Sequence, residues 1–271
     1  MRKIVLLLST FFITLSLMSQ NVGQQGDTLL NYVDINGMKQ GNWKQYHENG
    51  NPRYEAYFVD DKPIGKLTRW DNKGNLYAIL EYKNTGEKAT ARFYHSNGKI
   101  AATGNYLGKS KDSIWLYYDE NSHLYLQESY EKGEKHGIFK QFTSEGILIE
   151  LITWKQGIKN GSWKKFYVEG PLMWEANFVD GKLEGDAKSY YKNGKLQKEG
   201  KFVNDLMEGA WLRYKENGTF EKVLQYKNGV CPEVDQENEE MYKELLKNKD
   251  QIEGPNNAND LDWLRNTNNR R

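Results

Sequence analysis

The sequence GNWKQYHENG at residues 41–50 returns, with small changes, as GSWKKFYVEG at 161–170 and as GAWLRYKENG at 209–218. The first glycines of these copies are separated by multiples of 24 residues. Recurrence at a fixed period is typical of a repeat protein, in which each unit contacts mainly its neighbours. A frame of 24 residues that starts at Gly41 therefore organises the rest of the chain.

This frame fits eight consecutive units, from residue 41 to residue 232, without an insertion or a deletion. Position 1 is always small: Gly41, Gly65, Ala89, Ser113, Gly137, Gly161, Gly185 and Gly209. Position 6 is always aromatic: Tyr46, Trp70, Tyr94, Tyr118, Phe142, Phe166, Tyr190 and Tyr214. Position 18 is also always aromatic: Phe58, Tyr82, Tyr106, Tyr130, Trp154, Phe178, Phe202 and Tyr226. Such columns are typical of rings that pair across strands and hold a sheet together.

Each unit has the pattern of a β-hairpin. In residues 172–178, LMWEANF, apolar side chains occupy every second position, which predicts a strand with one buried and one solvated face. Asn-Gly dipeptides precede the second strand at 49–50, 97–98, 193–194 and 217–218. Because Asn and Gly tolerate the positive φ angles of tight hairpin turns, these dipeptides predict the turn between the two strands.

The prediction is an all-β fold: an elongated, single antiparallel meander sheet of eight tandem 24-residue β-hairpins, with a short C-terminal helix. The aromatics at positions 3 and 6 of the first strand have opposite parity, so they face opposite sides unless a bulge intervenes, and the sequence leaves both arrangements open. The third unit has Ala89 and Ala91 where Gly and Trp are expected. This departure predicts a kink or a weaker ladder between residues 86 and 125.

The pattern G-x-W-x-x-Y-x-x-N-G, as in residues 41–50, resembles the MORN repeat (membrane occupation and recognition nexus), specifically its bacterial variant. The resemblance extends over residues 41–232. It implies the hairpin fold. It also implies an antitoxin-like protein of the YwqK type, a label that bacterial proteins built from this variant often carry. Since the repeat serves as a scaffold in unrelated settings, the resemblance says more about fold than about function.

The composition excludes some partners. Charged residues make up 28% of the chain, with 38 basic and 37 acidic side chains, and the mean hydropathy is −0.86. Nucleic-acid binding needs clustered positive charge, and binding to anionic membranes needs a polybasic surface. The even balance of charge therefore argues against both, and no nucleic acid is expected as a partner.

The first residues, MRKIVLLLSTFFITLSLMSQ, predict a signal peptide over residues 1–19. A basic start at Arg2 and Lys3 precedes an apolar run from Ile4 to Leu17. A helix of this length rises about 21 Å, short of the roughly 30 Å hydrocarbon layer. The expectation is an exported protein, which is periplasmic, outer-membrane-associated or secreted. Membrane contact is expected only through this segment if it stays uncleaved.

The flanks of the repeats differ from them in composition. Residues 20–40 are expected to form a short N-terminal lead-in that caps the first unit. After residue 232 the aromatic period ends, and residues 233–252 predict a marginal helix that caps the sheet edge. Residues 253–271 are rich in Asn and are expected to be disordered. Cys231 is the only cysteine, so no internal disulfide is expected.

No convergent set of catalytic or metal-binding residues is evident in the sequence. His47 and His95 hold the same position two units apart, about 19 Å on a regular sheet, whereas zinc ligands lie near 2 Å from one ion. Neither a nucleophile elbow nor a phosphate-binding glycine loop is present. The protein is therefore predicted not to be an enzyme, with no catalytic residues, no cofactor and no bound metal.

The regularly spaced aromatics are expected to hold the strands together, which leaves the other aromatics as candidates for partner binding. These candidates are Tyr57, Tyr77, Trp174 and Tyr191, together with Trp263 in the C-terminal tail. The predicted function is a non-catalytic exported scaffold that binds a protein or a cell-envelope component. Two alternatives stay open: an antitoxin-like protein that neutralises a partner toxin, and an envelope glycan-active enzyme with a site near residues 86–125.

Overall fold

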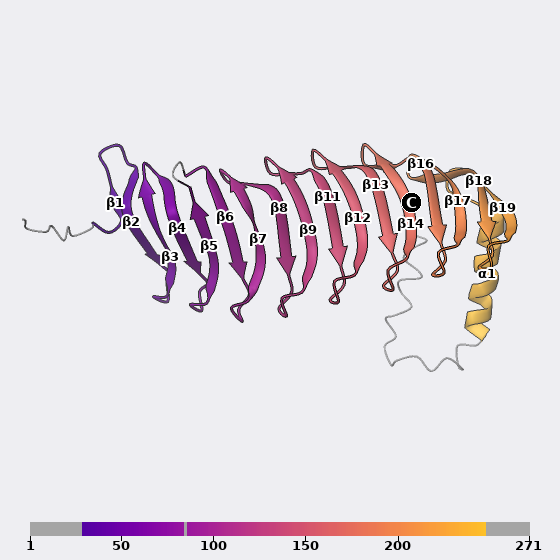
Figure 1. The fold of residues 1–271 in the computed structure, drawn as a ribbon, viewed down its shortest axis with the longest axis horizontal. Helices are drawn as coiled ribbons and strands as arrows, with labels where there is room; N and C mark the ends of the chain where they lie inside the picture. The colour runs from indigo at the N-terminus through magenta and orange to yellow at the C-terminus, as the bar shows by residue number, and fades with distance from the viewer. Residues whose placement is uncertain (1–28, 84–85, 248–271) are drawn as a thin grey trace, which may run out of the picture.

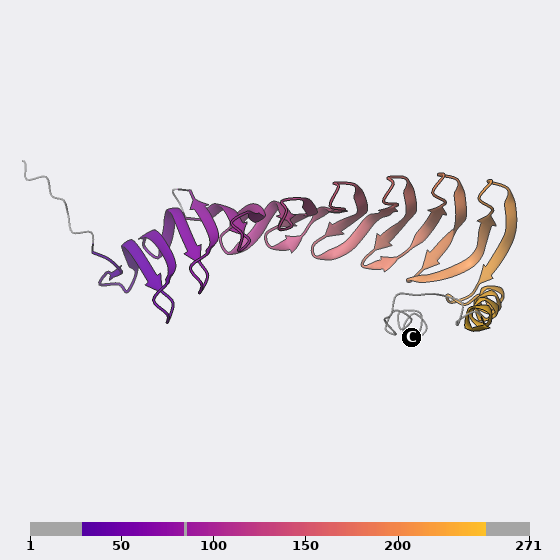
Figure 2. The ribbon, with the colours of Figure 1, turned by 90° about the horizontal axis from the view of Figure 1, so that it is seen from below.

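A computed structural model of the protein describes residues 29–83 and 86–247. Within those residues the chain forms 19 strands and one helix, arranged as a long, curved ribbon (Figure 1 and Figure 2). The strands are β1 (Tyr32–Val33), β2 (Lys39–Tyr46), β3 (Pro52–Val59), β4 (Lys62–Trp70), β5 (Leu76–Tyr82), β6 (Lys88–Tyr94), β7 (Ile100–Leu107), β8 (Ser110–Tyr118), β9 (Leu124–Glu131), β10 (Glu134–Lys135), β11 (Gly137–Phe142), β12 (Leu148–Lys155), β13 (Ile158–Phe166), β14 (Leu172–Val179), β15 (Lys182–Leu183), β16 (Gly185–Tyr190), β17 (Leu196–Val203), β18 (Leu206–Tyr214) and β19 (Phe220–Tyr226). The helix is α1 (Pro232–Lys247).

The strands form one antiparallel meander sheet, in which each repeat strand pairs with the next one along the chain. Two repeat strands are interrupted, so β10 and β11 both pair with β9, and β15 and β16 both pair with β14. The eight predicted hairpins account for sixteen strands. The two interruptions add two more, and β1 brings the total to 19 strands in the described residues. The predicted all-β fold of tandem hairpins with a short C-terminal helix is confirmed.

The turn inside each hairpin needs a positive φ at position 10. Gly50 has a φ of 84°, and Ser122, which replaces glycine in the fourth unit, has a φ of 77°. The asparagine before that glycine is predicted to adopt a positive φ as well. It does not, and it contributes to the turn through hydrogen bonds of its side chain. Asn97 accepts a hydrogen bond from the Lys99 N–H at 3.0 Å and donates one to the carbonyl of Glu120 at 2.9 Å. The asparagine therefore links its own turn to the turn of the next unit.

Six of the turns between hairpins are tight, with two residues between the paired strands, whereas the connection from Lys83 to Lys88 is longer. Asp60 and Asp61 have φ angles of 47° and 62°, and Asp180 and Gly181 have φ angles of 48° and 87°. Two consecutive left-handed residues make a type I′ turn, whose twist matches that of the flanking strands. These two-residue turns fix the register in which one unit meets the next.

A bulge recurs at position 13 of every unit. In the first hairpin Tyr46 pairs with Pro52 and Gln45 pairs with Tyr54, which leaves Arg53 without a partner residue. The other seven hairpins have the same shift. Because the extra residue lies on the second strand, the first strand keeps its alternation. The aromatics at positions 3 and 6 therefore face opposite sides of the sheet.

One side of the sheet, named here the packed face, carries positions 3, 14, 16 and 18 of each unit. The rings of Trp43, Trp115 and Trp211 at position 3 are buried. Trp211 contacts the rings of Phe202 and Tyr226, with centroids 5.4 Å and 6.0 Å apart. Position 3 thus touches position 18 of its own unit and of the preceding unit, so the aromatic columns join neighbouring units.

Two units leave space on the packed face that the tryptophan of the following unit fills. The small cross-strand pairs that make this space are Ala91 with Gly104 and Ala187 with Gly200. A Cβ atom on Gly200 would lie only 2.2 Å from the ring of Trp211. Gly200 is therefore required by the close approach of this ring.

The expected weakening of the ladder between residues 86 and 125 is not found in the described part of that segment. Strand β6 pairs with β7 over its whole length, and β7 continues the pairing to β8. The small residues of the third unit are explained by Trp115, whose ring lies against Gly104. The small residues therefore make room for this ring, and the sheet continues through the third unit without a break.

The two ends of the ribbon are built differently. At the N-terminal end, β1 pairs with β2 through two residues. At the C-terminal end, α1 lies against the packed face of the last hairpin, where Val234 packs against the buried cluster that includes Trp211 and Leu224. Glu237 of α1 also pairs with Arg213 at 2.9 Å. The helix therefore covers apolar surface that a further unit would cover inside the ribbon.

Four predicted segments fall wholly or partly outside the described residues. These are the signal peptide at 1–19, the first part of the lead-in at 20–40, the end of the helical segment 233–252 and the tail at 253–271. Within residues 29–83 and 86–247, no helix combines the length and the apolar character that crossing a membrane requires.

Candidate partner-binding surface

The side of the sheet opposite the packed face, named here the open face, carries positions 2, 4, 6, 12, 15 and 17. In several units positions 4 and 15 hold opposite charges. Lys44 and Glu55 are 2.8 Å apart in the first unit, and Lys188 and Glu199 are 3.7 Å apart in the seventh. These units present solvated ion pairs, which keep the open face polar and add little to stability.

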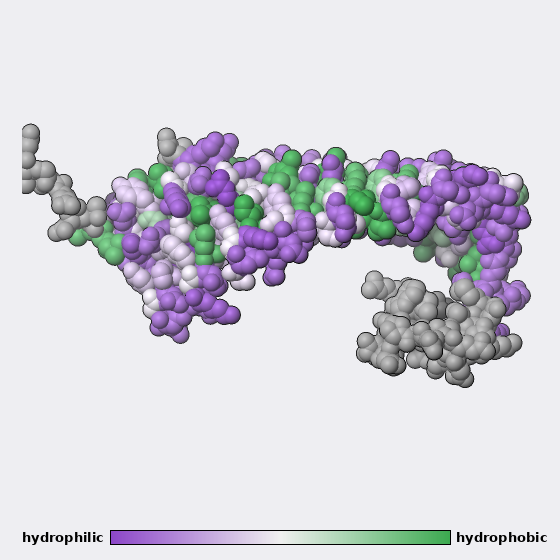
Figure 3. Space-filling model, turned by 60° about the horizontal axis from the view of Figure 1, so that its bottom comes forward, coloured by the Kyte–Doolittle hydropathy of each residue, from purple (hydrophilic) through white to green (hydrophobic). Residues whose placement is uncertain are grey.

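In the fourth and fifth units the open face changes character. Aliphatic side chains occupy positions 2, 4 and 15 in a group named here the central patch: Ile114, Leu116, Ile138 and Leu151. Ile114 is 51% exposed and Ile138 is 43% exposed. Their cross-strand partners, Ser129 and Thr153, are uncharged. Figure 3 shows hydrophobic residues along the middle of the ribbon and a mostly hydrophilic surface over the last hairpins. An exposed apolar surface with a polar surround is typical of an interaction site.

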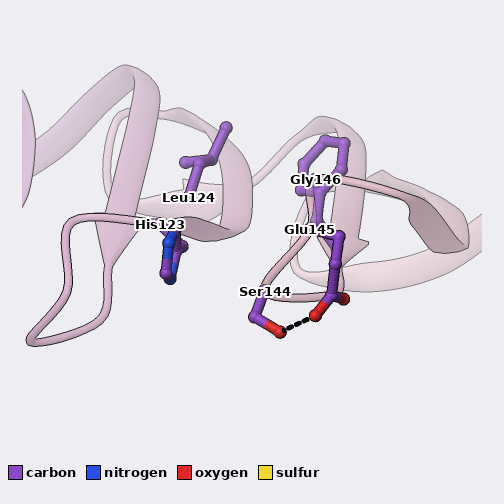
Figure 4. A pocket seen from close by; sticks show the side chains of 6 residues that line it. His123, Leu124, Ser144, Glu145 and Gly146 are labelled. Carbon is purple, nitrogen blue, oxygen red and sulfur yellow. Dashed lines mark hydrogen bonds between the residues drawn. The ribbon is translucent and has the colours of Figure 1, made fainter.

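A hollow of about 270 Å³ opens between the turns at residues 119–123 and 143–147 (Figure 4). Its lining residues are His123, Leu124, Phe142, Ser144, Glu145 and Gly146. Leu124 and Phe142 hold positions 12 and 6, which belong to the open face. The hollow therefore continues the central patch toward the turns.

The hollow lies where a bridging side chain is replaced by a shorter one. In four other units the side chain at position 7 reaches the carbonyl of position 6 in the next unit: His47, His95, Tyr167 and Tyr191. Tyr191, for example, donates from its hydroxyl to the carbonyl of Tyr214 at 2.8 Å. The fourth unit has Asp119 there, and its carboxylate accepts the His123 N–H of its own turn at 2.8 Å. Because Asp119 faces its own turn, it does not fill the space toward the next one.

The rim of the hollow is polar and carries negative charge. The backbone N–H of His123 is the main cause that lowers the pKa of Asp119. The Ser144 hydroxyl donates to Glu145 Oε1 at 2.7 Å and lowers the pKa of Glu145 (Figure 4). The carboxylate of Glu145 at the rim, and that of Asp119 in the adjoining turn, are therefore ionised at neutral pH. The arrangement fits an apolar side chain of a partner that is flanked by a basic group.

The packed face holds a buried charge that the sequence analysis missed. Glu128, at position 16, is only 7% exposed, whereas the other units have an apolar residue or glycine at this position. Lys135 Nζ lies 2.7 Å from its carboxylate, and the Tyr130 hydroxyl donates to it at 2.7 Å. Glu128 is the only charged residue at position 16 of the eight units, and this exception could have identified the buried charge from the sequence.

The pKa values in this cluster indicate a structural role. Burial acts to raise the pKa of Glu128, but hydrogen bonds from Lys135, Tyr130 and Tyr117 outweigh it and lower the pKa overall. Burial and the nearby carboxylate raise the pKa of Tyr130 to about 12. At neutral pH the cluster is thus an ionised carboxylate held by an ammonium group and neutral phenols. Neither Glu128 nor Tyr130 changes its protonation near neutral pH.

The residues predicted to bind a partner do not come together in the structure. Tyr57 and Tyr77 are exposed in the first two units. Trp174 belongs to the packed face, and its ring stacks on that of Trp211 at 6.5 Å. Tyr191 forms the inter-unit hydrogen bond described above, and Trp263 lies outside the described residues. The four described candidates therefore lie in four units and share no surface, whereas the residues of the central patch lie on the open face of two neighbouring units.

Metal-ligating side chains are likewise dispersed. In the part of the chain that the structure describes, no three His, Cys, Asp or Glu side chains form a group able to hold a metal ion. His47 and His95 instead lie 3.0 Å and 2.8 Å from backbone carbonyls of the following units.

Three segments of the chain match the family model of the MORN repeat variant: residues 39–60, 89–107 and 183–204. They correspond to the first, third and seventh units. The match supports a MORN-repeat protein, in agreement with the resemblance in the sequence. No curated protein gives a significant match to the chain.

Some solved structures show weak similarity. TarM is 15% identical with a TM-score of 0.26, over 33% of this chain and 18% of that one. A TarM mutant from S. aureus, in complex with fondaparinux, alpha-GlcNAc-glycerol and UDP, is 12% identical with a TM-score of 0.27, over 40% and 19% of the two chains. The TcdB2-TccC3-Cdc42 structure is 10% identical with a TM-score of 0.19, over 71% and 12%. The chain spans less than a fifth of the length of these structures. Likeness at this level supports no inference about fold or function.

Proposed function

We propose that the protein is a non-catalytic repeat scaffold whose open face binds a partner protein through the central patch and the adjoining hollow. The observation that carries this proposal is the change of the open face along the ribbon. Ion pairs such as Lys44–Glu55 and Lys188–Glu199 hold positions 4 and 15 in the first and seventh units, whereas the fourth unit has uncharged Leu116 and Gln127 there, beside exposed Ile114. The match to the MORN repeat variant supports a scaffold built from repeats.

The proposed partner presents an apolar side chain to the hollow and a basic group to its rim. Leu124 and Phe142 line the apolar part of the hollow, and the ionised carboxylate of Glu145 lies at its edge. Buried apolar anchors contribute most of the free energy at such interfaces, and charges at the rim contribute orientation and association rate.

The test uses the full-length chain as an immobilised bait in a cell-envelope extract of its own organism. The double variant I114K/I138K places two ammonium groups on the central patch. Because both side chains are well exposed, the variant should fold normally and lose saturable partner capture by at least about tenfold. Ala210→Lys is the matched control, since Ala210 holds the same position 2 in the eighth unit and is also exposed. It should capture the partner as the unmodified chain does.

Two outcomes would overturn the proposal: no saturable partner, or a partner that the double variant captures as well as the unmodified chain. A partner that is toxic when expressed alone and harmless together with this chain would identify the antitoxin-like alternative. The same capture experiment therefore separates the two functions.

Export of the protein, and the bacterial type of its repeats, are further parts of this proposal. The basic start at Arg2 and Lys3 and the apolar run that follows support export. Cell fractionation and N-terminal sequencing should find the chain in an envelope or secreted fraction, without the residues of the predicted signal peptide. A full-length chain confined to the cytoplasm would contradict export and leave the open-face proposal intact.

A further inference from the structure

Strand β19 closes the sheet at its C-terminal end. Within the described residues, β18 is the only strand that pairs with it. In each of the seven preceding units, the second strand of the hairpin is paired along both of its edges. An unpaired edge presents a row of N–H and C=O groups, which is a template for another strand.

The seven internal junctions show which kind of strand fits this edge. At each junction, position 14 pairs with position 5 of the next unit, and position 15 pairs with position 4. At the last junction, for example, Glu199 pairs with Leu212. Lys222 and Val223 hold positions 14 and 15 at the free edge. An incoming strand is therefore antiparallel to β19 and places successive residues opposite Val223 and Lys222.

Helix α1 limits what this strand can carry on the packed face. Leu224 and Cys231 are fully or almost fully buried, and Val234 of α1 packs against the buried cluster to which both belong. Inside the ribbon, the residue equivalent to Leu224 is covered by the side chain at position 3 of the next unit, as Trp211 covers Gly200. The ribbon itself uses a small residue at that position in two units, Ala91 and Ala187. With α1 in place, a small side chain fits and a tryptophan does not.

The open-face side of the same edge favours an aliphatic residue. Val223 is 39% exposed there, and its partner across β18 is Leu212. An aliphatic side chain opposite Val223 would extend this apolar pair by one strand, because cross-strand neighbours contact each other directly.

We propose that the edge of β19 binds an extended segment of a partner protein as an added antiparallel strand. The segment has a small residue on the side of α1 and an aliphatic residue opposite Val223. A second copy of this chain is a poor occupant, because its equivalent strand, β2, carries Trp43 at position 3. The outer edge of β2 is also engaged, since the Asn31 N–H donates to the carbonyl of Asn42 at 2.9 Å.

The probe is a synthetic peptide with the sequence of residues 185–191, GDAKSYY, in which Lys188 is replaced by Leu. It begins after Leu183 because Cys231 of the protein itself holds the equivalent position, directly after the Lys227–Val230 turn. This strand has Ala187 at the small position, and the K188L change supplies the aliphatic residue. Hydrogen exchange of the full-length protein should show saturable protection of residues 220–226 on peptide addition. A peptide that also carries A187W should bind at least about tenfold more weakly, because the ring overfills the space beside α1. N-methylation of the backbone nitrogens on the pairing edge should abolish protection, because it removes the donors.

Matched variants of the protein localise the effect. Val223→Glu should weaken peptide binding at least about tenfold by placing a charge opposite the aliphatic residue. Val179→Glu alters a valine at the end of β14 that is somewhat more exposed, 50% against 39%, and should leave binding unchanged. The variant I114K/I138K should also bind the peptide normally, so the test is independent of the proposed open-face function.

Three results would overturn the proposal. The first is protection that is absent or lies away from residues 220–226. The second is equal binding of the A187W peptide. The third is protection of residues 220–226 that appears without peptide and rises with protein concentration, which would identify a second copy of the chain as the occupant.

Discussion

The packed face and the open face both carry aromatic rings in a fixed column, but the rings have different surroundings. On the packed face, Trp115 and Trp211 are almost completely buried against rings of neighbouring units. On the open face, the ring at position 6 is only partly buried, and Tyr190 donates its hydroxyl to Glu175 at 2.6 Å. One repeat period therefore specifies a tightly packed layer on one side and a solvated, hydrogen-bonded layer on the other. Stability should depend on the first, and partner binding on the second.

Removing a ring from the packed face should have the largest effect. Trp211→Ala should lower the free energy of unfolding of the last units by about 3–5 kcal/mol, because the cavity cannot collapse between paired strands. Native-state hydrogen exchange across β17, β18 and β19 measures this locally, which suits a repeat array that need not unfold in one step. Tyr46→Ala, an exposed ring at position 6, is the control and should change little. Equal losses for the two variants would erase the distinction between the faces.

Adding one carbon to the packed face should have the next largest effect. Gly200→Ala places a Cβ atom where the ring of Trp211 now lies, and should cost about 1–3 kcal/mol in the free energy of unfolding. In the double variant G200A/W211L the smaller side chain removes the clash. The losses measured for the single variants G200A and W211L should therefore sum to more than the loss measured for the double variant. Additive losses would show that Gly200 does not depend on the ring.

The buried carboxylate should give an intermediate and pH-dependent effect. Glu128→Gln should cost about 2 kcal/mol near pH 7, because Lys135 loses a charged partner. The folded-state pKa of Glu128 is lowered, so its stabilisation is present in full above the unfolded value of about 4.3 and is lost as the pH falls through the folded value. The difference between the two proteins in hydrogen exchange of β9 should therefore shrink below about pH 4. A difference that grows toward acid pH would contradict this assignment.

The smallest effect is expected on the open face. Glu55→Gln breaks the ion pair with Lys44, and both side chains of that pair are well solvated. The unfolding midpoint in denaturant should stay within measurement error, since exposed ion pairs add little to stability. A marked drop would mean that the ion pairs of the open face, as well as the rings of the packed face, hold the units together.

Much of the fold could be predicted from the sequence, because the repeat makes each local pattern visible eight times. The alternation in residues 172–178 and the glycine at position 10 both appear in the structure as expected. The bulge at position 13 could not be predicted, since it depends on how the two strands pair and leaves no fixed residue type. The role of Gly200 also required coordinates, because the ring that needs it belongs to another unit.

The candidate site was less accessible to sequence reasoning. Aliphatic residues at Ile114 and Ile138 interrupt a mostly polar column, but the sequence did not show which face each column occupies. The hollow adjoins Asp119, whose carboxylate accepts from the N–H of His123 and so lies in its own turn, away from the next unit. Searching for aromatics outside the columns instead selected Trp174, whose ring belongs to the packed face.

Small-angle X-ray scattering of the full-length chain would show whether the units stack in a row. A compact globule of this length has a radius of gyration of about 18 Å. Sixteen repeat strands at about 4.8 Å spacing form a sheet roughly 75 Å long, which corresponds to a radius of gyration of about 24 Å or more. We expect the larger value, with the asymmetric distance distribution of an elongated particle. A value near 18 Å with a symmetric distribution would contradict the ribbon and both binding surfaces inferred from it.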